Sequence, residues 1–221
     1  MDISVVVPLY NEEESLPELY AWIERVMKAN GFSYEVIFVN DGSTDRSWQI
    51  IEELSRKSDT VHGIKFRRNY GKSPALYCGF EKAQGDVVIT MDADLQDDID
   101  VIDKFVDEYY NGSQIVYGVR KSRKTDTFFK RTTAIAFYKL MRMMGVELVY
   151  NHADYRLMSK RAVEELEQYK EVNLFLRGLV PLIGFESSVV EYDRGKRYAG
   201  ESKYPLKKMI FFAIDLSLIH I

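Results

Sequence analysis

The chain has 221 residues, of which 46% are hydrophobic and 29% charged, as is ordinary for one globular domain with a full core. A formal net charge of −4 argues against a protein that binds nucleic acid. The single cysteine, Cys78, excludes an internal disulfide and fits a reducing compartment. We expect no signal peptide, and no apolar run reaches the roughly 18 residues that span a bilayer.

Short apolar runs alternate with amphipathic patterns over the first two thirds of the chain. The runs are typical of buried parallel strands and lie at 3–7, 36–39, 64–66, 87–91 and 115–119. The patterns between them predict helices that begin at Ser15 and that cover 45–56, 71–83 and 100–110. The apolar face expected for the first helix consists of Leu16, Leu19, Tyr20, Ile23, Val26 and Met27. The alternation predicts an α/β fold, with a mostly parallel sheet flanked by helices and ligands bound beyond the carboxyl ends of the strands.

Two helix starts carry capping signals. Ser15 is followed three residues later by Glu18, which predicts a capping box. Ser43 or Thr44 is expected to cap the second helix, after a tight turn at Gly42.

The pattern changes after residue 120. A long helix is expected at 127–144, and strands are expected at 155–158 and 187–192. A basic loop with two glycines follows at 194–204, and Pro205 opens a final amphipathic helix.

Acidic segments follow the first, second and fourth predicted strands. The segment after the second strand contains Asp41, which by itself reads most simply as a turn residue. Two such loops at neighbouring strand ends would, however, form a pocket for the hydrogen-bond donors of a nucleobase and ribose.

The fourth predicted strand ends in Asp92-Ala93-Asp94. Two carboxylates one residue apart can both reach one hard cation, and Mg²⁺ and Mn²⁺ prefer oxygen ligands and keep open positions for phosphate oxygens. Such a motif alone is a weak signal, but at a strand end beside other acidic loops it predicts a divalent metal site. The metal would neutralise a departing diphosphate.

Taken together, these segments resemble family 2 glycosyltransferases. The segments are Val7-Pro8-Leu9-Tyr10-Asn11-Glu12, Val39-Asn40-Asp41-Gly42-Ser43-Thr44-Asp45 and Asp92-Ala93-Asp94. The resemblance implies a GT-A fold, with a Rossmann-like sheet, and inverting, metal-dependent transfer of a hexosyl-type sugar from a nucleoside diphosphate. It further implies that Pro8, Tyr10, Glu12, Asp41, Lys72 and Gln96 bind the nucleotide sugar, and that Asp92 and Asp94 bind it through Mg²⁺ or Mn²⁺.

A narrower resemblance extends over nearly the whole chain. It is to the polyprenyl-phosphate branch, which includes dolichol-phosphate mannose synthases and bactoprenol glucosyltransferases. The matching segments are 69–76, 94–97, 154–158, 175–180, 184–185 and 194–204. Asp98-Ile99 replaces the Pro-Pro common in that branch, and Leu182 stands where many members have Trp, so the shape of the donor or acceptor site is open to difference.

An acceptor that is itself a phosphate needs cations close by, and arginine binds phosphate in bidentate fashion. A basic run at 120–131 has only Asp126 as an acid, although charge runs are usually solvated surface. The resemblance assigns acceptor or diphosphate binding to Arg120, Arg131, Arg177, Arg194, Arg197, Ser202 and Lys203. The loop at 194–204 could close over the diphosphate.

Asp154 and Asp94 are the candidate catalytic residues. In the wider family an acid near position 154 deprotonates an acceptor hydroxyl. A phosphate acceptor is already largely anionic near neutral pH, so Asp154 could instead position Arg156 or the acceptor.

The last stretch combines lysines with apolar residues, which is typical of an interfacial helix. Packing on the domain or in an oligomer is the other interpretation. We therefore expect a GT-A domain at 1–204, and at 205–221 a juxtamembrane helix that precedes transmembrane helices in a longer protein. The expected location is the cytoplasmic face of the membrane.

The expected reaction is transfer of a sugar from a nucleoside diphosphate, with UDP favoured and GDP possible, to a polyprenyl (undecaprenyl or dolichyl) phosphate. One alternative is transfer to a sugar hydroxyl in glycan assembly, although the Gln-x-x-Arg-Trp element of processive synthases is missing. Another is a nucleotide-sugar-binding module without catalysis. A dehydrogenase is disfavoured because no G-x-G-x-x-G follows the first strand.

Overall fold

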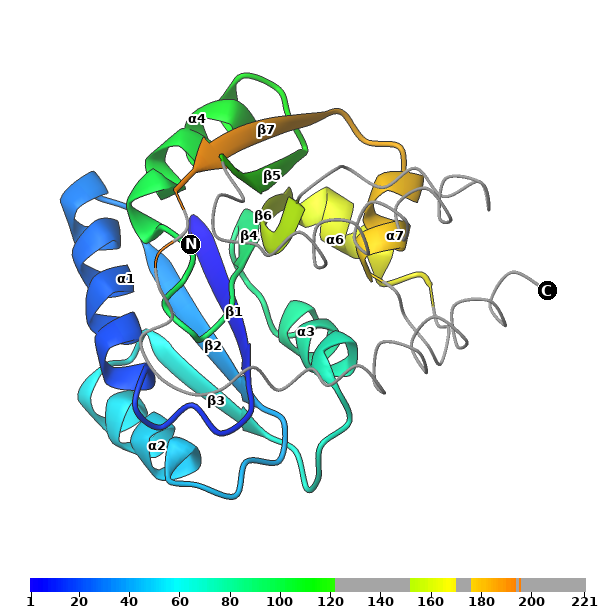
Figure 1. Cartoon of the computed structure of the whole chain (residues 1–221). Helices are drawn as coiled ribbons and strands as arrows, with labels where there is room; N and C mark the ends of the chain where they lie inside the picture. The colour runs from blue at the N-terminus through cyan, green and yellow to red at the C-terminus, as the bar shows by residue number, and fades with distance from the viewer. Residues whose placement is uncertain (122–151, 170–175, 194, 196–221) are drawn as a thin grey trace, which may run out of the picture.

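The structure is a computed structural model that describes residues 1–121, 152–169, 176–193 and 195 (Figure 1). Its strands are β1 (Ile3–Leu9), β2 (Tyr34–Asn40), β3 (Val61–Lys65), β4 (Val87–Thr90), β5 (Ile115–Arg120), β6 (His152–Ser159) and β7 (Ser187–Tyr192). Its helices are α1 (Leu16–Asn30), α2 (Ser47–Lys57), α3 (Lys72–Phe80), η1 (Ile99–Val101), α4 (Ile102–Tyr110), α6 (Lys160–Leu166) and α7 (Leu176–Leu182).

The described strands form one sheet in the order β3-β2-β1-β4-β6-β5-β7. Strand β6 runs antiparallel to both of its neighbours, and the other pairs are parallel. The predicted α/β fold with a mostly parallel sheet is confirmed. The third strand, however, was predicted at 64–66 and lies at Val61–Lys65. Because β3 is an edge strand in which only Val61 is buried, its apolar residues do not mark its bounds.

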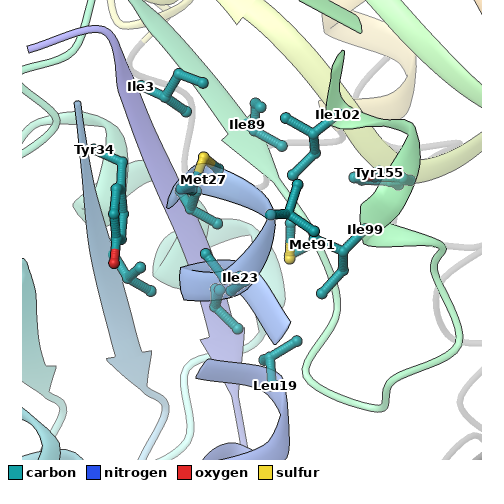
Figure 2. Close-up of a cluster of buried hydrophobic side chains, with 14 of the residues drawn as sticks. Ile3, Leu19, Ile23, Met27, Tyr34, Ile89, Met91, Ile99, Ile102 and Tyr155 are labelled. Carbon is teal, nitrogen blue, oxygen red and sulfur yellow. The ribbon is translucent and has the colours of Figure 1, made fainter. Parts of the chain in front are cut away.

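Two apolar layers cover the sheet. On one face, Val5, Phe38 and Ile89 pack with α1, η1 and α4, as Figure 2 shows for Ile89 beside Met27 and Ile102. On the other face, the neighbouring residues of the same strands, such as Val6, Ile37 and Val88, pack with α3, α6 and α7. Because both faces are covered, the central strands are mainly apolar, and β1 and β2 are buried along their whole length.

Helix α1 has the predicted apolar face. Its buried residues are Leu16, Leu19, Tyr20, Ile23, Val26 and Met27. The predicted capping box at its start is wrong. Ser15 has helical backbone angles, and its hydroxyl donates to the carbonyl oxygen of Glu12 at 3.1 Å instead of accepting from the first turn, because a turn from Glu12 runs directly into the helix.

The helices expected at 127–144 and 205–221 lie outside the described residues. Among the residues that the structure describes, no helix is long and apolar enough to cross a membrane.

Candidate active site

The loops after β1 and β2 are joined by direct hydrogen bonds. The backbone N–H of Asn11 donates to the Ser43 hydroxyl at 2.9 Å, and the backbone N–H of Thr44 donates to Asn11 Oδ1 at 2.8 Å. The prediction that Ser43 or Thr44 caps α2 is therefore wrong, and the N-cap residue of α2 is Arg46. The prediction that the two loops lie side by side is confirmed, since both strands end at the same edge of the sheet.

Asp41 is buried at this edge with a relative exposure of 4%. Its two carboxylate oxygens accept from the backbone N–H groups of Tyr70 at 2.7 Å and Gly71 at 2.9 Å. Burial raises the pKa of Asp41, while these two hydrogen bonds lower it, and the net direction is upward. The carboxylate thus holds the segment that leads into α3, and Lys72 is the next residue of that segment.

Gly42 follows Asp41 with a φ of +74°, and a Cβ atom there would lie 2.6 Å from the backbone nitrogen of Asn69. Gly42→Ala is therefore expected to destabilise the protein more than Gly31→Ala does, by about 1–3 kcal/mol, because backbone atoms cannot yield as side chains do. Gly31 is the matched control, with a φ of +71° and no described heavy atom within 4 Å of its Cβ position. Urea denaturation of both variants measures the difference, and equal losses would show that the close approach is unimportant.

Lys72 connects two acidic groups that are far apart in sequence. Its ammonium lies 2.5 Å from Asp92 Oδ1 and 2.5 Å from Asp154 Oδ2. Burial lowers the pKa of Lys72, but the two carboxylates raise it by more than burial lowers it. The pKa therefore lies above its ordinary value, and the ammonium stays charged.

Strand pairing brings Asp154 to Asp92. In the antiparallel β4–β6 pair, Thr90 lies opposite Arg156, and the same register continued by two residues places Asp92 opposite Asp154. The Thr90 hydroxyl also donates to the backbone carbonyl of Asp154. Asp154 Oδ1 accepts from the buried Arg156 guanidinium at 3.1 Å, so Arg156 and Lys72 contact different oxygens of one carboxylate.

Asp94 is half-buried, and its Oδ1 accepts from the backbone N–H of Gln96 at 3.2 Å. Leu95 between them has a φ of +58°, a conformation that is uncommon outside glycine. The carbonyl of Gln96 accepts from the backbone N–H of Gly195 at 3.0 Å. The one described residue of the predicted basic loop therefore contacts the loop that contains Asp92 and Asp94.

Asp92 and Asp94 fit a divalent cation by their chemistry. They are half-buried carboxylates, one residue apart, just beyond the end of β4. Within the described ranges, no group of three or more His, Cys, Asp or Glu side chains could hold a metal ion. Two protein carboxylates would leave positions for phosphate oxygens and water, as Mg²⁺ and Mn²⁺ sites in phosphate-binding enzymes do. The metal role of these two residues stays a prediction.

Asp97 and Tyr192 were not predicted to act in the site, yet they join the acidic loop to Arg120. The Tyr192 hydroxyl donates to Asp97 Oδ1 at 2.5 Å, and the Arg120 guanidinium lies 3.6 Å from the same oxygen. Arg120 Nε also donates to the Tyr192 hydroxyl at 3.3 Å. Asp97 belongs to the matching segment 94–97, but only the tertiary structure shows that it faces β5 and β7.

Asp97 is expected to make stability depend on pH. Burial, together with the neighbouring Asp92, raises its pKa from 3.8 to about 6. An acid with a raised folded-state pKa stabilises the fold below its unfolded pKa, and this contribution is lost as the pH rises through the folded pKa. Asp97→Asn should therefore gain stability relative to the wild type between pH 4 and pH 7, by about 1–3 kcal/mol. Denaturant midpoints across this range measure it, with exposed Asp100→Asn as the control. A stability difference between Asp97→Asn and the wild type that does not change with pH would contradict the prediction.

The other predicted site residues are placed as follows. Pro8 is buried within β1, while Tyr10 and Glu12 are half-buried in the loop after it. Arg177 belongs to α7, but its side chain lies outside the description. Five predicted phosphate-binding residues lie outside the described ranges, namely Arg131, Arg194, Arg197, Ser202 and Lys203.

Comparison with known sequences identifies relatives over nearly the whole chain. The family model described as Glycosyl transferase family 2 matches residues 4–167. The uncharacterized glycosyltransferase YkoT of Bacillus subtilis (strain 168) is 52% identical over 96% of this chain, which spans 66% of that protein. The bactoprenol glucosyl transferase of Shigella phage SfV is 40% identical over 97% of this chain and 70% of that protein.

Solved structures share the fold at low sequence identity. S. aureus TarS 1-349 in complex with UDP-GlcNAc has a TM-score of 0.64 and 19% identity, covering 100% of this chain and 66% of that one. Glucosyl-3-phosphoglycerate synthase from Mycobacterium tuberculosis, in complex with Mn²⁺, UDP and phosphoglyceric acid, has a TM-score of 0.61 and 16% identity, covering 98% of this chain and 76% of that one. The chain therefore belongs to glycosyl transferase family 2 and has the GT-A fold.

Proposed function

We propose that this glycosyltransferase moves a hexose from a nucleoside diphosphate, with UDP as the favoured nucleotide, to a polyprenyl phosphate. The observation that carries the proposal is the convergence of Asp92, Lys72 and Asp154 at one point, reached from β4, α3 and β6. The similarity to a bactoprenol glucosyl transferase over 97% of the chain supports the lipid phosphate as acceptor.

Each group has a task in an inverting displacement. Asp92 and Asp94 would hold a divalent cation, which would supply charge stabilisation to the leaving diphosphate. Asp41 contributes by fixing the segment 70–71, since its carboxylate accepts both backbone N–H groups. The nucleoside is expected to lie against the joined loops after β1 and β2, beside Tyr10 and Glu12.

The acceptor side is built around Arg120. Its guanidinium is held by Tyr192 and Asp97, and its side chain keeps an exposed fraction of 24%. A fixed, partly exposed guanidinium suits bidentate binding of a phosphate. The phosphate oxygen would attack the anomeric carbon from the face opposite the diphosphate, so positioning and charge supply most of the rate.

The proposal extends to location and organisation. A polyprenyl phosphate resides in a membrane, so a GT-A domain at 1–204 followed by a juxtamembrane segment at 205–221 would act at the cytoplasmic face. The chain covers 66% of the length of two curated relatives from Bacillus subtilis. Light scattering measures whether the protein also associates into a homo-oligomer.

The test is a transfer assay with Mn²⁺ or Mg²⁺, a panel of UDP- and GDP-sugars, and undecaprenyl phosphate in detergent. Formation of a lipid-linked sugar as the single product supports the proposal. A glycan-linked product from a sugar acceptor supports transfer to a hydroxyl instead. Nucleotide binding without turnover on any lipid phosphate indicates a binding module.

A further inference from the structure

Lys72 lies at the first position of α3 with its ammonium between two carboxylates. Its side chain is 34% exposed, Asp92 is equally exposed, and Asp154 is 13% exposed. The backbone before Lys72 is fixed, because Asp41 accepts the N–H groups of Tyr70 and Gly71. Four side-chain carbons separate the fixed backbone from the ammonium, so the charge can move while the helix start stays in place.

The ammonium and a divalent cation cannot both lie against Asp92 without strong repulsion. Each is a compact positive charge, and at about 4 Å like charges repel by several kcal/mol near a protein surface. A lysine ammonium is positively charged near neutral pH, and this one contacts Asp92 and Asp154 directly. A cation that binds Asp92 must therefore displace the ammonium from the oxygen that it contacts at 2.5 Å.

We propose that Lys72 is a built-in competitor that couples metal binding to donor binding. Without a donor, its contact with Asp92 keeps the affinity for Mg²⁺ or Mn²⁺ low. A nucleoside diphosphate offers the ammonium new anionic oxygens, so Lys72 exchanges Asp92 for the diphosphate and leaves that carboxylate to the cation. The inference rests on the proposed function and adds a coupling to it. The metal binds more tightly when the nucleotide is bound, and the nucleotide binds more tightly when the metal is bound.

The test measures Mn²⁺ affinity by isothermal titration calorimetry, with and without UDP, in the wild type, Lys72→Met and Lys72→Gln. Without UDP, both variants are expected to bind Mn²⁺ about tenfold more tightly than the wild type. The factor by which UDP strengthens Mn²⁺ binding should fall by a similar amount, within the usual range for coupled sites. Thermal unfolding checks that the variants fold.

Lys121→Met is the matched control, because it also replaces one lysine by methionine, and the Lys121 side chain is 50% exposed with its ammonium 4.0 Å from Asp193. It should change Mn²⁺ affinity without UDP by less than about threefold, as expected for a screened charge. An equal effect of Lys121→Met and Lys72→Met would overturn the inference in favour of general electrostatics.

The outcomes separate the inference from the proposed function. If the wild type binds Mn²⁺ and UDP and transfers sugar, but the Lys72 variants bind Mn²⁺ no more tightly, only the competition is refuted. If the wild type binds neither Mn²⁺ nor UDP, the proposed function fails and the inference fails with it.

Discussion

Replacing Asp94 with alanine is expected to lower metal-dependent sugar transfer by roughly a thousandfold, the loss typical of removing one group that stabilises charge in a transition state. Asp94 and Asp92 are the two carboxylates just beyond β4 that we propose as ligands of one cation. Without Asp94, a single carboxylate that already contacts Lys72 would remain to hold the metal.

The measurement is the initial rate with undecaprenyl phosphate across a Mn²⁺ titration. Excess metal should restore only part of the rate, because the ligand itself is missing. Asp107→Ala is the control, since it removes one exposed carboxylate from α4 and keeps the change in net charge equal. Unchanged turnover in Asp94→Ala would refute the metal assignment.

Asp154→Asn is expected to lower turnover by roughly 10²–10⁴-fold if Asp154 acts as a base, and to lower stability as well. Asp154 is the carboxylate that contacts both Lys72 and Arg156, and the Arg156 side chain is only 3% exposed. Removing one partner of a buried ion pair costs up to about 3–5 kcal/mol, because the other charge stays buried.

Two readouts distinguish a base from an organiser. A base lost without other change lowers kcat and leaves nucleotide affinity intact, whereas a lost organiser also weakens the binding of UDP with Mn²⁺. Stability is compared with Asp193→Asn, in which the replaced carboxylate is 85% exposed and lies 4.0 Å from Lys121, and which should stay within about 0.5 kcal/mol of the wild type. A stable and fully active Asp154→Asn would remove Asp154 from the mechanism.

Local sequence patterns were sufficient for most of the fold. The apolar runs identified β1, β2, β4 and β5, because strands covered on both faces must be apolar at nearly every position. The periodicity of α1 predicted its buried face residue by residue. Both patterns depend on which side of an element faces the core, and this is set by the spacing of residues along the chain.

Capping was predicted poorly, for a physical reason. Ser15, Ser43 and Thr44 are good capping residues, but each uses its polar groups in turns or in contacts between loops. A hydroxyl that can bond either to its own helix or to a neighbouring loop is not assigned by local sequence, because the choice depends on where the loop lies.

The sequence by itself determined the family motifs, the strand and helix pattern, and the acidic residues that follow the strands. Only the tertiary structure decided that Asp154 lies beside Asp92 with Lys72 between them, and that Asp97 and Tyr192 hold Arg120. The reason is that β6 inserts antiparallel between β4 and β5. Strand order and direction depend on pairing between distant segments, and local periodicity carries no information about that pairing.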